Sequence, residues 1–166
     1  MTKSNAFRVD TFESRDFGVL GYVDSDARVL FYRSVTRPHT AATPFDVRGK
    51  KALPRVDIVY SYAGADGVLV DALTARRPDG MVLVGLGGGS YPGAFLEAGK
   101  RAVQAGIPVV LATRSWNGRV VITPKKDAGG FLVCDDLMPQ KARILLLLAL
   151  TITRERSAIQ KMFYEY

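Results

Sequence analysis

From residue 55 onward, short apolar segments alternate with segments that have the periodicity of amphipathic helices. Apolar runs of strand length predict β-strands at 56–60, 81–84, 108–112 and 130–134. Between them, residues 68–76 and 92–106 repeat apolar side chains at helical spacing, with Gly106 as a C-terminal stop. This alternation predicts an α/β fold: a small four-stranded parallel sheet flanked by helices.

Two further helices are expected near the C-terminus. Pro139 suits the first turn of a helix, and the run from Ile144 to Leu150 is apolar almost all round, so we expect it to be covered on most sides. Ser157 is the expected N-cap of a terminal helix. The segment 115–130 is polar and glycine-containing, and we expect a mobile loop there.

The first 54 residues lack this alternation and are expected to form an irregular arm. Two β-rich segments, 19–23 and 29–33, flank a short polar turn and predict a β-hairpin. We expect five aromatic side chains to anchor the arm: Phe7, Phe12, Phe17, Phe31 and Phe45. The predicted organisation is an arm over 1–54 and an α/β domain over 55–166.

Charge and hydropathy exclude several classes of protein. The net charge of +7 is scattered in pairs of basic residues rather than gathered in a stripe, which argues against nucleic-acid binding. The longest apolar run, Ile144 to Ile152, is far shorter than the ~20 residues that span a bilayer, so no membrane partner is expected. The N-terminus has no apolar signal segment, which predicts a cytoplasmic location as written and leaves a periplasmic one open for a longer parent.

The residue types that carry most catalysis are scarce. Cys134 is the single cysteine and lies in an apolar run, which favours a buried strand position. His39 is the single histidine, and without an acidic or nucleophilic neighbour it favours a structural hydrogen bond over catalysis. No serine-hydrolase or metalloprotease motif occurs, and we expect no metal and no cofactor. The chain therefore carries no complete catalytic set.

The segment Gly85–Ser90 follows a predicted strand and precedes a predicted helix. Glycines permit a tight turn and a close approach of ligand, and helix N-termini favour anions. A dinucleotide-binding loop would need its third glycine where Ser90 stands, and the next strand ends at 112–114 without an acidic residue for a ribose. A tight turn without a nucleotide is therefore favoured. A non-enzymatic small-molecule or nucleotide-binding domain remains the alternative function.

Six segments, in order and at matching spacing, resemble the bacterial type II L-asparaginases and the related glutaminase-asparaginases. They are TKSN at 2–5, FGVLGY at 17–22, RPHT with TPFDV at 37–47, LPRVDIVY at 53–60, DGM at 79–81 and PQKARILL at 139–146. The resemblance covers nearly the whole chain but only the second half of the family. It implies a C-terminal asparaginase-type domain.

The resemblance also implies an activity and a site. The family hydrolyses asparagine or glutamine to the acid and ammonia through a threonine acyl-enzyme, without a metal. Its two catalytic threonines lie in T-G-G-T-I and H-G-T-D-T motifs, which do not occur here. Lys3 matches the lysine that helps to activate the second threonine. Gly88 and Ser90 match a G-N-G-N loop that reaches the active site of a neighbouring subunit, and Thr123 aligns with a glutamate that also crosses that interface.

Two departures from the family pattern bear on the substrate. Ser90 replaces an asparagine, so a planar amide becomes a shorter single hydroxyl. Thr123 replaces a carboxylate that could bind an ammonium group. We therefore expect the amino and carboxylate groups of a substrate to be bound differently.

We further expect three properties of the chain. It should form a homo-oligomer, act on a small amide only when completed by an N-terminal nucleophile domain, and show negligible hydrolysis alone. An apolar face left exposed without that domain should drive self-association or poor solubility.

Overall fold

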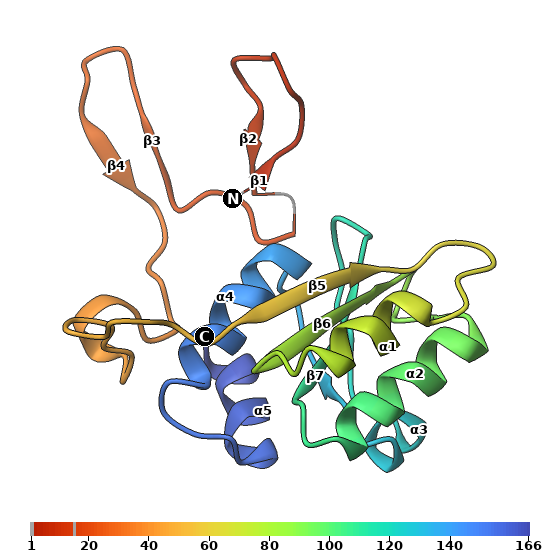
Figure 1. Cartoon of the computed structure of the whole chain (residues 1–166). Coiled ribbons are helices and arrows are strands. Elements are labelled where there is room, and N and C mark those ends of the chain that lie inside the picture. The colour runs from red at the N-terminus through yellow and green to blue at the C-terminus, as the bar shows by residue number, and fades with distance from the viewer. Residues whose placement is uncertain (1, 15) are drawn as a thin grey trace.

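The computed structural model describes residues 2–14 and 16–166 (Figure 1). At its centre is a four-stranded parallel sheet in the order β5-β6-β7-β8, which confirms the predicted fold class. Its strands are β5 (Val56–Tyr60), β6 (Gly80–Gly85), β7 (Val109–Thr113) and β8 (Leu132–Val133). The pairing is in register without a bulge, so the carboxyl ends of the strands meet at one edge.

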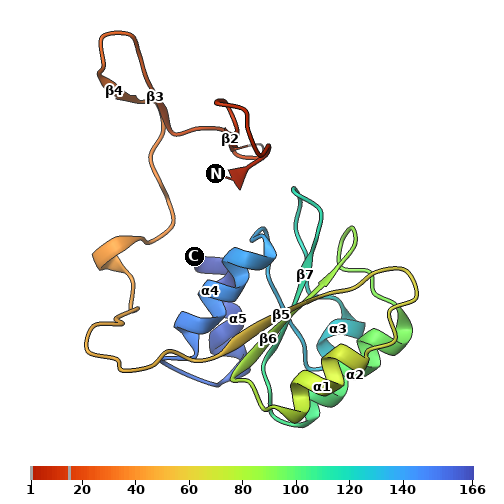
Figure 2. The same cartoon turned by 45° about the horizontal axis from the view of Figure 1, so that its top comes forward.

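Helices cover both faces of the sheet. Figure 2 shows α1 (Val68–Ala75) and α2 (Gly93–Gln104) on one face, with α4 (Pro139–Ala149) and α5 (Arg156–Glu165) on the other. Every residue of β6 and β7 is buried, which explains why these strands are continuous apolar runs rather than alternating ones. Each large side chain buried in this way stabilises the fold by about 1.5–3 kcal/mol.

The predicted helix ends are correct for α2 and wrong for α5. Gly106 follows α2 with a φ of 81°, the left-handed geometry expected of a glycine stop. The N-cap of α5 is Glu155 rather than Ser157, because the Glu155 carboxylate accepts hydrogen bonds from the N–H groups of Ser157 (2.9 Å) and Ala158 (2.6 Å). Ser157 lies inside the helix.

The segment between β7 and β8 is more ordered than predicted. It contains a short helix, α3 (Pro124–Ala128), which begins after Thr123. The Thr123 hydroxyl accepts a hydrogen bond from the Lys126 N–H at 3.4 Å, and proline occupies the first turn, so both usual start signals are present. β8 has two residues instead of five, since Gly130 bends the chain with a φ of 71°.

The arm contains the predicted hairpin and a second one. β3 (Gly21–Val23) pairs antiparallel with β4 (Val29–Phe31), and β1 (Thr2–Lys3) pairs with β2 (Phe12–Glu13). The β3–β4 hairpin extends away from the α/β domain (Figures 1 and 2).

Most of the expected aromatic anchors are wrong. Phe7, Phe12, Phe17 and Phe31 are all exposed. Only Phe45, which follows the short 3-10 helix η1 (Thr40–Ala42), packs on the domain, with its ring 5.0 Å from that of Tyr166. Phe31 fails as an anchor because its hairpin, β3–β4, extends away from the α/β domain, whereas Phe17 lines a pocket beside the domain and is still exposed.

Candidate functional site at the carboxyl edge of the sheet

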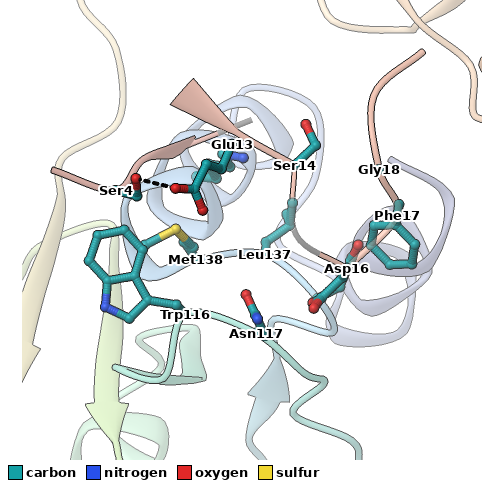
Figure 3. Close-up of a pocket in the computed structure, with 12 residues that line it drawn as sticks. Ser4, Glu13, Ser14, Asp16, Phe17, Gly18, Trp116, Asn117, Leu137 and Met138 are labelled. Carbon is teal, nitrogen blue, oxygen red and sulfur yellow. Dashed lines mark hydrogen bonds between the residues drawn. The ribbon is translucent and has the colours of Figure 1, made fainter. Parts of the chain in front are cut away.

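Two pockets lie at the carboxyl edge of the sheet, where open α/β folds place their sites. The first, the arm pocket, has a volume of about 250 Å³ and lies between the arm, the loop after β7 and the start of α4 (Figure 3). It is lined by Ser4, Glu13, Ser14, Asp16, Phe17, Gly18, Trp116, Asn117, Asp136, Leu137, Met138 and Lys141.

Hydrogen bonds hold the arm over this edge. The Ser4 hydroxyl donates to the Glu13 carboxylate at 2.7 Å, which joins β1 to β2 within the pocket (Figure 3). The Gly118 N–H donates to the Asp16 carboxylate at 3.1 Å, which joins the arm to the loop after β7. The pocket is therefore built from segments far apart in the sequence.

Two acidic residues that follow Cys134 after β8 form ion pairs, and the second of them lines the arm pocket. Asp135 is buried and accepts a hydrogen bond from the Arg119 guanidinium, and this bond raises the pKa of Arg119. The guanidinium of Arg37, in the arm, lies 3.7 Å from a carboxylate oxygen of Asp135 and 3.2 Å from one of Asp136. These carboxylates fix the arm and the loop in place, which does not suit a general base.

The second pocket, the glycine-turn pocket, has a volume of about 450 Å³. It is lined by Gly88, Gly89, Ser90, Tyr91, Leu96, Leu111, Thr123, Lys125, Lys126 and Phe131. Leu86 and Ser90 exchange two backbone hydrogen bonds, of 3.0 and 2.8 Å, which close the turn. Gly89 has a φ of 89°, and a Cβ there would lie 3.0 Å from a Val120 methyl group, so the turn requires glycine at this position.

Lys126 joins this turn to the neighbouring loop. Its ammonium donates to the carbonyl oxygens of Gly88 and Val121, both at 2.9 Å. Partial burial lowers the pKa of Lys126 below its ordinary value. A half-buried cation therefore forms part of the pocket wall.

The structure brings together three of the four residues that the sequence proposed for the site. Gly88, Ser90 and Thr123 share the glycine-turn pocket. Lys3 lies on β1, is exposed, and is the neighbour of Ser4 in the arm pocket. The roles of all four remain predictions.

Sequence reasoning missed Lys126, Asp135 and the arginines that pair with Asp135. The available signal was the pair of acidic residues directly after a predicted strand.

Cys134 is buried as expected, and His39 is exposed, with its ring 3.4 Å from the Thr40 hydroxyl. Over residues 2–14 and 16–166, no cluster of three or more acidic, histidine or cysteine side chains suits a metal ion. In the same residues no helix has the length and hydropathy to cross a bilayer.

Residues 55–163 match the model of the glutaminase/asparaginase C-terminal domain. The chain belongs to the glutaminase/asparaginase family. It is 40% identical to L-asparaginase 2 of Bacillus subtilis and 38% identical to L-asparaginase 2 of Escherichia coli, in both cases over 100% of this chain. Its fold matches the crystal structure of a probable cytoplasmic L-asparaginase from Campylobacter jejuni with a TM-score of 0.94, at 40% identity and over 99% of this chain.

The chain spans about half the length of those relatives. It spans 44% of the Bacillus protein, 48% of the Escherichia protein and 54% of the Campylobacter chain. The similarity covers the arm as well as the α/β domain, since it extends over the whole chain.

Proposed function

We propose that this chain supplies the C-terminal half of an asparaginase-type amidohydrolase and is inactive until another stretch of protein presents the nucleophile. The observation that carries the proposal is full-length similarity to asparaginases of which this chain spans less than half. The threonine motifs of the family are not among its 166 residues. The substrate class is L-asparagine or L-glutamine.

The proposed reaction begins with attack of a threonine hydroxyl on the amide carbon. The C–N bond breaks, the departing nitrogen takes up a proton and leaves as ammonia, and water then hydrolyses the ester to aspartate or glutamate. Such acyl transfer needs a nucleophile, a base and oxyanion donors within hydrogen-bond reach of one another. In this chain Lys3 would assist the nucleophile, and Gly88, Ser90 and Thr123 would contact the substrate.

The exposure of Lys3 supports the expected inactivity of the isolated chain. Lysine becomes a useful base when burial disfavours its charged form. A completing domain packed over β1 would provide that burial as well as the hydroxyl group. Docking of that domain would therefore supply both the burial of Lys3 and the nucleophile.

An ammonia-release assay with asparagine and glutamine tests the proposal. We expect no turnover by the purified chain and measurable turnover after addition of the N-terminal segment of the Bacillus relative. In the reconstituted enzyme, Lys3→Ala should lower kcat by about 10²–10⁴-fold, as expected for loss of a general acid–base group. Lys50→Ala, an exposed arm lysine, is the matched control. Clear turnover by the 166-residue chain alone would refute the proposal.

The alternative is a small-molecule or nucleotide-binding domain that uses the glycine turn without catalysis. The closed turn weighs against it, because the N–H groups of Leu86 and Ser90 are already bonded within the turn and cannot face a phosphate. Calorimetry with NAD, ATP, asparagine and aspartate separates the two functions. Saturable heat with NAD or ATP alone would favour the alternative.

A further inference from the structure

The glycine-turn pocket has an unbalanced positive charge. Lys125 and Lys126 are among its lining residues, and none of the lining residues is acidic. Lys125 forms no ion pair within the described parts of the chain, and the partners of Lys126 are two neutral carbonyl oxygens. A half-buried ammonium without a counter-ion is costly, and an anion that enters the pocket would relieve that cost.

Two acidic side chains that could balance this charge, Glu97 and Asp127, already have other partners. The Glu97 carboxylate accepts a hydrogen bond from Lys100 at 2.7 Å, which is the main cause of its lowered pKa, and the nearby charge of Lys125 adds only a minor part. Asp127 pairs with Arg156 at 2.6 Å. Neither carboxylate is among the residues that line the pocket, so the positive charge there is not balanced by a lining carboxylate.

Hydrogen-bond donors are also available in the pocket. A lysine ammonium has three hydrogens, and two of those of Lys126 point to carbonyl oxygens, so one remains for a ligand. Ser90 and Thr123 are exposed and contribute hydroxyl groups to the same pocket. Ammonium and hydroxyl donors together are the groups that bind carboxylate or phosphate oxygens.

We propose that the glycine-turn pocket binds a small oxyanion, with Lys125, Lys126, Ser90 and Thr123 as its ligands. The consequence for the substrate rests on the proposed function. The enzyme would prefer an amide that places a carboxylate, rather than an ammonium, in the glycine-turn pocket. No carboxylate lines the pocket that could pair with the ammonium of an amino acid. This assigns the specificity of the site to the charge of two lysines.

Nuclear magnetic resonance on the ¹⁵N-labelled full chain tests the binding without turnover. The probes are succinamate, succinate, inorganic phosphate and 1,4-diaminobutane at constant ionic strength. We expect saturable shifts of the amide signals at 88–90 and 123–126 with succinamate and succinate, and none with the diamine. If phosphate binds and succinamate does not, the oxyanion site is supported, and its ligand is a free oxyanion rather than the carboxylate of an amide. Shifts that do not saturate, or that appear with the diamine alone, would overturn the proposal.

Three variants make the test specific. Lys125→Gln removes charge without breaking a hydrogen bond of the fold, and it should weaken succinamate binding about tenfold. Lys50→Gln removes the same charge from the arm and should leave binding unchanged. Thr123→Glu should abolish succinamate binding and introduce diamine binding. Equal weakening by Lys125→Gln and Lys50→Gln would show a general charge effect and refute the site.

Failure of this proposal can be told from failure of the proposed function. Oxyanion binding by the isolated chain, with no ammonia release after reconstitution, would sustain the pocket and reject the amidohydrolase. Turnover after reconstitution, with no saturable binding of any oxyanion, would sustain the amidohydrolase and reject the oxyanion pocket.

Discussion

At the scale of single residues, Cys134 shows how its place in the fold sets the chemistry of a side chain. It directly follows β8, and its side chain is fully buried. Burial disfavours the thiolate and raises the pKa of the Cys134 thiol to about 12. A cysteine in this state does not suit nucleophilic catalysis near neutral pH.

We predict that Cys134 reacts with a thiol reagent at about pH 8 far more slowly in the native chain than in the denatured chain, because reaction needs the accessible thiolate. The rate of labelling with and without denaturant measures this. Equal rates would show that the thiol is open to solvent in the native state.

The same residue predicts a dependence of stability on pH. In the unfolded chain the thiol ionises near its ordinary pKa of 9.0, whereas in the folded chain it stays protonated to about 12. The contribution to stability is therefore complete below about pH 9 and is lost as the pH rises from there to about 12. Denaturant unfolding of the wild type and Cys134→Ala over this interval should show a shallower decline in the variant. Parallel declines would contradict the assignment.

At the scale of elements, Tyr91 joins the turn before α2 to the centre of the sheet. Its hydroxyl lies 2.7 Å from the Ala112 carbonyl of β7 and 3.1 Å from the Leu83 carbonyl of β6. Its ring stacks on Phe95 of α2 with the ring centres 6.2 Å apart. Burial raises the pKa of Tyr91, which keeps the hydroxyl a donor. This contact holds the glycine turn against the sheet.

Tyr91→Phe should therefore lower the free energy of unfolding by about 1–2 kcal/mol, the usual effect of removing a buried hydrogen-bond partner. Denaturant unfolding gives the value. Tyr62→Phe serves as the control, since Tyr62 is exposed and its loss of a hydroxyl should be neutral. A similar loss in both variants would mean that the two carbonyl contacts contribute little.

At the scale of the whole molecule, an apolar groove of about 520 Å³ lies between the arm and α4. Its lining residues are Pro38, Thr43, Phe45, Leu137, Gln140, Lys141, Ile144, Leu145, Leu148 and Tyr166. As expected, α4 is covered on most sides, and Ile144, which is 49% exposed, marks the side that faces this groove. A large exposed apolar surface favours association with another protein surface.

We predict that the chain self-associates through this groove. Ile144→Glu should weaken association about tenfold or more, since it removes an apolar side chain whose burial is worth about 1.5–3 kcal/mol. Ile152→Glu is a matched control, because Ile152 is 47% exposed but lies outside the groove. Sedimentation velocity over a range of concentrations measures the effect. A wild-type chain that stays monomeric throughout would contradict the prediction.

The sequence by itself determined the four strands and the four longer helices of the α/β domain, but not the short helix α3, because apolar periodicity follows directly from which side of a strand or helix is buried. Through resemblance to a family, it also predicted that Gly88, Ser90 and Thr123 bind a substrate, and these three residues line one pocket. Only the tertiary structure decided what surrounds them. The approach of Lys126 to the glycine turn, the pairing of Arg37 with Asp136 and the exposure of the arm aromatics depend on contacts between distant segments. Such contacts leave no local pattern, because the partner that makes each side chain buried, paired or exposed lies elsewhere in the chain.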